Sequence, residues 1–164
     1  MTEEVASPEE QARLAYAASI RLLARRDHSI QELTRKLIQR EHAQAAIDNA
    51  VQELLELNYL NETRYAELYA EQRMNRGFGP LSIQAKLRER GIPPHLIQWG
   101  LKQLAVDWSE KAESAIHKRF NVQEIGSSDQ KVIARIARHL QARGYAPSDA
   151  IQGLKKARRS RDIS

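Results

Sequence analysis

Residues 79–92 read GPLSIQAKLRERGI, and this stretch decides the fold. Pro80 suits the first position of a helix, because its ring fixes φ and it lacks the N–H group that would be left unbonded there. Ile83 and Leu87 then fall on one face, four residues apart, and Gly91 marks a helix end. The stretch predicts a short amphipathic helix between two turns.

The same pattern recurs elsewhere in the chain. Eight of the 22 residues in 83–104 are identical to the residues found 53 positions later. The identical pairs are Ile83/Ile136, Leu87/Leu140, Arg90/Arg143, Gly91/Gly144, Pro94/Pro147, Gly100/Gly153, Leu101/Leu154 and Lys102/Lys155. A shift of 50 positions toward the N-terminus aligns Leu37, Ile47, Val51 and Leu54 with Leu87, Ile97, Leu101 and Leu104. Such self-similarity predicts tandem units of about 50 residues.

Each unit holds three segments with helical period, so we predict an all-α fold of three tandem three-helix units that form an elongated, curved helical-repeat array. Capping residues mark helix starts at Ser7, Ser29 with Glu32, Asn61, and Asp107 with Glu110. We expect Leu87 and Leu101 in the core, and a loop through Gly126. The expected organisation is an acidic leader at 1–10, units at 11–60, 61–106 and 107–157, and a basic C-terminal tail at 158–164.

The composition of the 164 residues excludes several classes of protein. Aromatic residues make up 5% and there are only 7 glycines and 5 prolines, which argues against an all-β fold. The chain has no cysteine, which excludes disulfides, thiolate metal sites and cysteine nucleophiles. The first ten residues are acidic and hold no apolar run, so they predict no secretory signal, and no segment is apolar enough for a membrane span. We therefore predict a cytoplasmic protein, and a monomer.

No residue pattern predicts an enzyme. The five histidines are scattered, without metal-ligand spacing, and are expected at the surface or at helix caps. Gly77-Phe78-Gly79 superficially suggests a phosphate loop, but no strand precedes it, so we predict a turn with Pro80 opening the next helix. We predict no catalytic residue, no metal and no cofactor.

Basic residues are the stronger functional signal. The net charge is +5, and because the first ten residues carry −4, the remainder carries +9. Such a surplus favours an anionic partner, either nucleic acid or an acidic protein surface. Basic residues recur near the second helix of every unit, opposite the apolar stripe. They are Arg25, Arg26, Arg35 and Lys36 in the first unit, Arg73, Arg76, Lys86, Arg88 and Arg90 in the second, and Lys131, Arg135 and Arg138 in the third.

The two tryptophans are assigned to junctions between units. Trp99 lies off the stripe of Ile97 and Leu101, so it either packs between units or faces a partner, and we favour packing between units. Trp108 falls where the second unit meets the third, and we expect it to anchor that junction.

Four groups of residues form one recognisable set. They are Arg25-Arg26-Asp27-His28-Ser29 with Glu32-Leu33 and Lys36-Leu37, Tyr59 through Ala66, Arg73 through Ile92, and Asp107-Trp108 with Arg143-Gly144-Tyr145. Together these motifs resemble the RecX family, whose members regulate the RecA recombinase. The resemblance covers roughly residues 12–157, and it departs at Asn61-Glu62, where the family commonly has two acids. The resemblance implies a non-enzymatic modulator that lies in the groove of the RecA–DNA filament and limits filament growth, ATPase, strand exchange and coprotease activity.

Two other functions remain open at this point. Three-helix units also occur in helix-turn-helix proteins, which act directly on single- or double-stranded DNA. Against that function, residues 43–58 hold three acids and no Lys or Arg, and residues 94–106 hold only Lys102. An inert helical scaffold would fit the repeats but would leave the basic residues without a role.

Overall fold

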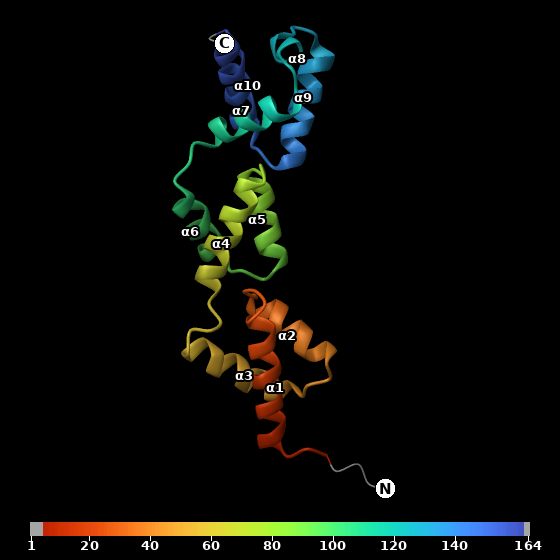
Figure 1. The fold of residues 1–164 in the computed structure, drawn as a ribbon, viewed down its shortest axis with the longest axis vertical. Coiled ribbons are helices and arrows are strands. Elements are labelled where there is room, and N and C mark those ends of the chain that lie inside the picture. The colour runs from red at the N-terminus through yellow and green to blue at the C-terminus, as the bar shows by residue number, and fades with distance from the viewer. Residues whose placement is uncertain (1–4, 163–164) are drawn as a thin grey trace.

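The computed structural model describes residues 5–162. The first four residues of the expected leader and the last two of the expected tail therefore lie outside the described residues. All secondary structure within residues 5–162 is helical, with ten helices and no strand, which confirms the all-α prediction. Three groups of helices follow one another along the long axis of the molecule, with the first and last helices at opposite ends (Figure 1).

The first unit consists of α1 (Pro8–Leu23), α2 (Ile30–Gln39) and α3 (Gln44–Glu56). The predicted caps are confirmed, because Ser7 accepts from the backbone N–H of Glu10 and Ser29 forms a reciprocal capping box with Glu32. α1 packs mainly on α3, and α2 packs less extensively against both of them. The core consists of aliphatic side chains that include Leu33, Leu37, Ile47 and Leu54.

The second unit repeats this arrangement with α4 (Glu62–Asn75), α5 (Pro80–Glu89) and α6 (Pro94–Leu104). Asn61 caps α4 by accepting from the backbone N–H of Arg64, and Pro80 opens α5 as predicted. Leu87 is fully buried beside Ile83. Leu101 is only half-buried, so the prediction that it belongs to the core as Leu87 does is wrong. It packs at the edge of the core rather than inside it.

The third unit has one helix more than the others. It consists of α7 (Trp108–Arg119), α8 (Val122–Gly126), α9 (Gln130–Arg143) and α10 (Pro147–Arg161). The expected loop through Gly126 therefore contains the five-residue α8, which a capping box between Asn121 and Glu124 starts and whose Ile125 is buried in the core. Asp107 caps α7 through the N–H of Ser109 and forms no capping box with Glu110, contrary to prediction.

The C-terminal basic residues belong to α10, which continues to Arg161. Arg158 donates from Nε to the carbonyl oxygen of Ile125 and from Nη2 to that of Ser127, at 2.9 and 2.8 Å. These bonds join the end of α10 to α8. Residues 158–161 are thus part of the packed third unit.

Trp108 packs against the cores of both the second and the third unit, so it anchors their junction as predicted. Trp99 does not pack between units, and that prediction is wrong. Its side chain is 48% exposed on α6, and its Nε1 donates to the carboxylate of Glu67 on α4, 2.6 Å away within the same unit.

The second and third units are joined backbone to backbone. The N–H of Gly79 donates to the carbonyl oxygen of Arg143 at 2.8 Å, and the N–H of Leu81 donates to that of Gly144 at 2.9 Å. The hydroxyl of Tyr145 donates to the carbonyl oxygen of Gly77 at 2.9 Å. Gly144 turns the chain at φ 92, a left-handed conformation that favours glycine. We call this contact between the second and third units the second seam.

Candidate interaction surface

The structure sorts the twelve predicted basic residues into two groups. Six are engaged within the protein, and they are Arg26, Lys36, Arg73, Lys86, Arg90 and Arg135. The other six have no ion-pair partner within residues 5–162, and they are Arg25, Arg35, Arg76, Arg88, Lys131 and Arg138. These last six side chains are all exposed and free to meet a partner.

A cleft of about 330 Å³ lies between the first and second units, and we call it the first cleft. It brings together Arg35 of α2 with Arg73, Lys86 and Arg90 of the second unit. The repeat pattern predicted these residues separately, and the fold places them around one hollow. Two acids share its lining, Glu32 and Glu89.

Glu32 is the centre of the contact between the first two units. Its Oε2 accepts from Arg26 and its Oε1 from Nε of Arg90, both at 3.0 Å, and Tyr65 donates to Oε1 at 3.1 Å. Burial alone would raise the pKa of Glu32. The bond and the charge of Arg26, with the bonds from Ser29 and Tyr65, outweigh burial and lower that pKa below its ordinary value.

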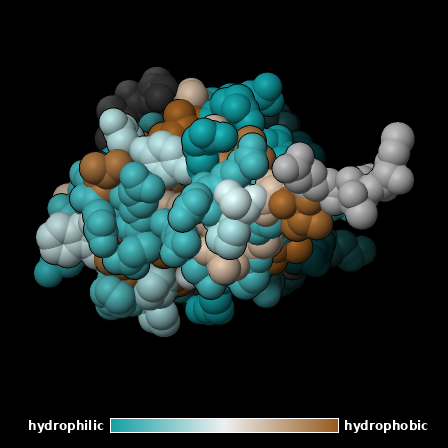
Figure 2. Space-filling view, turned by 90° about the horizontal axis from the view of Figure 1, so that it is seen from below, coloured by the Kyte–Doolittle hydropathy of each residue, from teal (hydrophilic) through white to brown (hydrophobic). Residues whose placement is uncertain are grey.

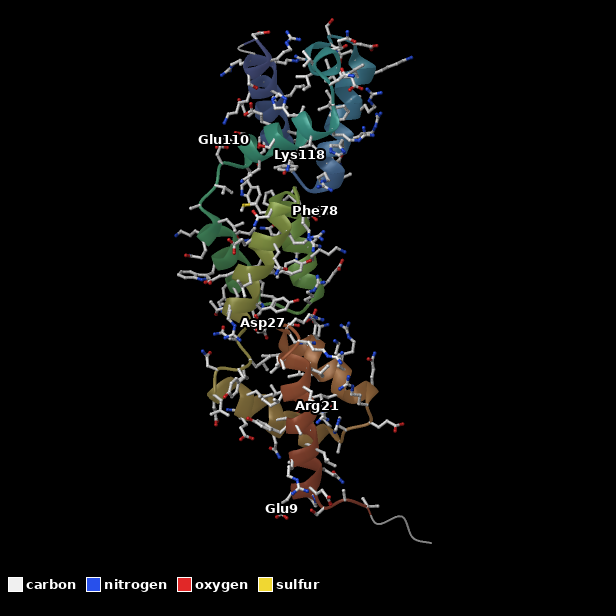
Figure 3. The ribbon with its side chains drawn as sticks, in the orientation of Figure 1. Glu9, Arg21, Asp27, Phe78, Glu110 and Lys118 are labelled. Atoms are coloured by element: carbon white, nitrogen blue, oxygen red, sulfur yellow. The ribbon has the colours of Figure 1, made fainter. Side chains whose placement is uncertain are left out.

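Arg90 therefore holds the two units together. Besides Glu32, its guanidinium binds the hydroxyl of Tyr69 at 2.8 Å and lies over the ring of the same residue. A second ion pair, between Arg64 of α4 and Asp27, crosses the same junction at 3.0 Å. Asp27 lies at this junction in Figure 3, between the lower and middle units.

Arg73 is also committed to the fold. Its guanidinium lies 3.7 Å from the centre of the Phe78 ring, and that of Arg143 lies 4.2 Å from the same ring. Cations are attracted to the face of an aromatic ring, so these two contacts steady the turn before α5. Arg73 is half-buried, and its Nε is buried without a hydrogen-bond partner.

Another hollow, of about 420 Å³, lies within the first unit beside His28 and is lined by Arg25, Arg26 and Lys36. His28 was expected at the surface or at a helix cap. It directly precedes Ser29, the N-cap of α2, and it is buried there, with 2% of its surface exposed. A lysine can only donate and a carbonyl only accept. The ring therefore accepts at Nε2 from Lys36, at 3.1 Å, and donates from Nδ1 to the oxygen of Arg26, at 3.0 Å. Burial lowers the pKa of His28.

The remaining predicted residues lie outside these hollows. Arg88 projects from α5, while Lys131 and Arg138 project from α9, all exposed. Arg135 of α9 binds the carboxylate of Glu124 on α8. The predicted strip is therefore not one continuous band of free cations.

The sequence reasoning missed a second group of basic residues, at the junction of the second and third units. A cleft of about 420 Å³, which we call the second cleft, is lined by Arg76 together with Lys111, Lys118, Arg119, His139 and Arg143. Lys118 and Phe78 are both seen at this junction in Figure 3. The one sequence signal was the basic last turn of α7, and only the fold brings it beside Arg76.

The third helices carry little basic charge. α3 has no Lys or Arg, and α6 has only Lys102. A helix that reads bases in a DNA groove needs donors and acceptors along its exposed face. A helix-turn-helix function is therefore not favoured by this arrangement.

Neither a metal cluster nor a membrane span is found in the part of the chain that the structure describes. Within residues 5–162, no group of three or more His, Asp or Glu residues is placed to hold a metal ion. Across the same range, every helix is too short or too polar to cross a bilayer.

Comparison with known proteins finds matches to one protein family. A family model described as "RecX, first three-helix domain" matches residues 15–54, and one described as "RecX, second three-helix domain" matches residues 61–101. The Regulatory protein RecX of Vibrio parahaemolyticus serotype O3:K6 (strain RIMD 2210633) is 36% identical over 129 residues, which are 79% of this chain and 82% of that protein. That of Trichlorobacter lovleyi is 37% identical over 142 residues, or 85% of this chain and 92% of that protein.

Solved structures agree on the fold. The crystal structure of RecX from Lactobacillus salivarius superposes with a TM-score of 0.79, at 21% sequence identity, over 95% of this chain and 99% of that chain. A likeness at this identity concerns the arrangement of the helices.

Proposed function

The chain belongs to the RecX family of regulatory proteins, and on that premise we propose that it binds the filament of the RecA recombinase on DNA and holds that filament in check. In this proposal it limits filament growth, and with it the ATPase, strand-exchange and coprotease activities of RecA. It acts in the cytoplasm, by binding alone, without a cofactor or a catalytic residue.

The observation that carries the proposal is the set of exposed, unpaired basic residues spread along an elongated body. Arg25 and Arg35 lie in the first unit, Arg88 in the second, and Arg138 in the third. A row of charges over several units suits a partner that is itself long, repetitive and anionic. Contacts of this kind weaken as salt screens the charges.

We propose that the protein acts as a monomer. The end formed by the first unit is mostly hydrophilic, with its apolar side chains in small, separate areas (Figure 2). A repeat array that stacked end to end with a second copy would need a broad apolar surface there. Repeat arrays usually end in a repeat whose outer face is polar, which keeps that end from stacking further.

The test compares two triple variants in RecA ATPase assays on single-stranded DNA. The first carries Arg25→Ala, Arg35→Ala and Arg88→Ala, which remove exposed charges from the first two units. The matched control carries Arg21→Ala, Lys155→Ala and Arg159→Ala, which remove the same net charge from exposed positions of α1 and α10. Arg73 and Arg90 are left in place because they hold the fold together.

We expect the first variant to need about tenfold more protein for half-inhibition, because rim charges act mainly on association. Its thermal stability should match that of the unaltered protein, since exposed charges add little to stability. Equal inhibition by the two triple variants would reject these residues as the contact. No inhibition by the unaltered protein would reject the function itself.

A further inference from the structure

The second cleft differs from the first in the balance of its charges. The first cleft holds two acids, Glu32 and Glu89, which bind Arg90 and Lys86. The second is lined by five Lys or Arg side chains and one His, with no Asp or Glu among its lining residues. Positive charge is thus partly neutralised in the first cleft and left without acids in the lining of the second.

Four of these cations have no ion-pair partner within the part of the chain that the structure describes, and they are Arg76, Lys111, Lys118 and Arg119. Arg76 comes from the end of α4 and the other three from α7, so they reach the cleft from two units. Gathering like charges opposes folding. A protein that keeps them together without acids has a site suited to an anion from outside.

Two further basic groups line the second cleft, His139 and Arg143. His139 lies in the same cleft, and burial, followed by the charges of Arg143 and Arg119, lowers the pKa of His139. Arg143 itself is committed to the carbonyl oxygen of Arg76 and to the Phe78 ring. The positive charge of Arg143 still acts within the cleft, although some of its N–H donors are already bonded.

The cleft is also held in shape before any ligand arrives. One wall belongs to the second unit and the other to the third, and the second seam ties them together. The hydroxyl of Tyr145, a lining residue, bonds to the carbonyl oxygen of Gly77, another lining residue. Because the walls are already fixed, a ligand would lose little binding energy in ordering them.

We propose that the second cleft is a phosphate-binding site. Several cations facing one hollow match a group that carries more than one charged oxygen, and the planar guanidinium of Arg119 suits paired phosphate oxygens. The phosphate belongs either to the backbone of a nucleic-acid strand or to a free nucleotide. This site deepens the proposed function, because DNA is part of a RecA filament. Binding of phosphate to the site can nevertheless be measured with this protein alone.

The experiment measures binding without RecA, so that its outcome is independent of the proposed function. The probes are a fluorescent oligothymidylate, followed by anisotropy, and ATP, followed by calorimetry. The site variant carries Lys118→Ala and Arg119→Ala. The control carries Lys155→Ala and Arg159→Ala, which remove the same charge from exposed positions of α10 outside the cleft lining. Circular dichroism and thermal melts establish that both variants are folded.

The site variant should bind the oligonucleotide about tenfold or more weakly than the control does. Its plot of log affinity against log salt should become shallower by about 1.4, at roughly 0.7 for each phosphate of a single strand that the two removed cations neutralised. Weaker ATP binding by the site variant, with no change in oligonucleotide binding, would support the site and assign it to free nucleotide. Equal weakening in both variants would overturn the proposal in favour of general charge, and so would no weakening in either.

An acidic protein surface is the competing ligand. If polyglutamate binds in a manner that depends on Lys118 and Arg119, while neither phosphate probe binds, the cleft recognises carboxylates and the proposal fails. Should the site variant not fold, a variant with Lys118→Gln and Arg119→Gln takes its place in the same assays. Glutamine is uncharged but keeps part of the aliphatic stem of each side chain.

Discussion

Gly79→Ala should separate the second unit from the third while leaving each of them intact. Gly79 has φ −87 and ψ 172, extended backbone that alanine adopts without strain. An added Cβ would lie 2.5 Å from the carbonyl carbon and oxygen of Gly144 and 2.6 Å from the nitrogen of Tyr145. All three atoms are backbone of the neighbouring unit, so the clash cannot be relieved by turning a side chain.

The size of the effect follows from the separation needed. Ordinary contact begins at 3.4 Å, so the two segments must part by about 0.9 Å. The bonds from the N–H groups of Gly79 and Leu81, now 2.8 and 2.9 Å, would lengthen to about 3.7–3.8 Å, beyond hydrogen-bond range. With the bond from Tyr145 the loss is three bonds at about 0.5–1.5 kcal/mol each. Alanine restores about 0.4–1 kcal/mol by restricting the unfolded chain, which leaves a net loss of about 0.5–4 kcal/mol.

Two measurements check this prediction. Urea unfolding should show a lower midpoint for the third unit, and the backbone N–H of Leu81 should exchange its hydrogen much faster, since it loses its acceptor. Gly126→Ala is the control, because the three atoms nearest to its added Cβ all belong to the movable guanidinium of Arg161. Unchanged unfolding together with unchanged exchange at Leu81 would show that close approach at Gly79 does not hold the units together.

Further predictions concern the cores and the buried charges. Leu87→Ala should cost about 2–5 kcal/mol, and Leu101→Ala clearly less, because only the first side chain is fully buried; chemical denaturation of both variants compares them directly. The pKa of Glu32 is lowered in the folded state, so its contribution is complete above pH 4.5 and is lost as the pH falls through the folded value; a urea midpoint that does not decline below pH 4.5 would contradict this. The lowered pKa of His28 adds a similar decline that begins below pH 6.5 and should be absent in His28→Gln. Burial raises the pKa of Glu62, whose Oε2 has no partner, so Glu62→Gln should raise the free energy of unfolding at pH 7 but not at pH 4.

Helical periodicity was enough to predict the units, because each helix buries an apolar stripe against its own neighbours. Ile83 and Leu87 and their counterparts Ile136 and Leu140 are buried as their spacing indicated. α8 escaped prediction because a five-residue helix is too short to show a period.

The junctions between units were beyond sequence reasoning. Nothing in the pattern around Gly79 indicates that its N–H bonds to Arg143, because such a bond depends on how two finished units meet. For the same reason the exposure of basic residues was predicted better than their partners. The fold assigns Arg90 to Glu32 and Arg73 to Phe78, and it adds Lys118 to a cleft that the repeats did not suggest.

The second seam also bears on the order in which the contacts between units can form during synthesis. The hydroxyl of Tyr145 and the carbonyl of Gly77 are 68 residues apart in the sequence. At about 5–20 residues per second, a ribosome needs about 3–14 seconds to add that much chain. Once α6 is complete at Leu104, the second unit can be folded while the N–H groups of Gly79 and Leu81 still lack their acceptors. The nascent protein therefore passes through a stage in which two units are finished and the docking edge of the second stands open to water, until Arg143 and Gly144 emerge to cover it.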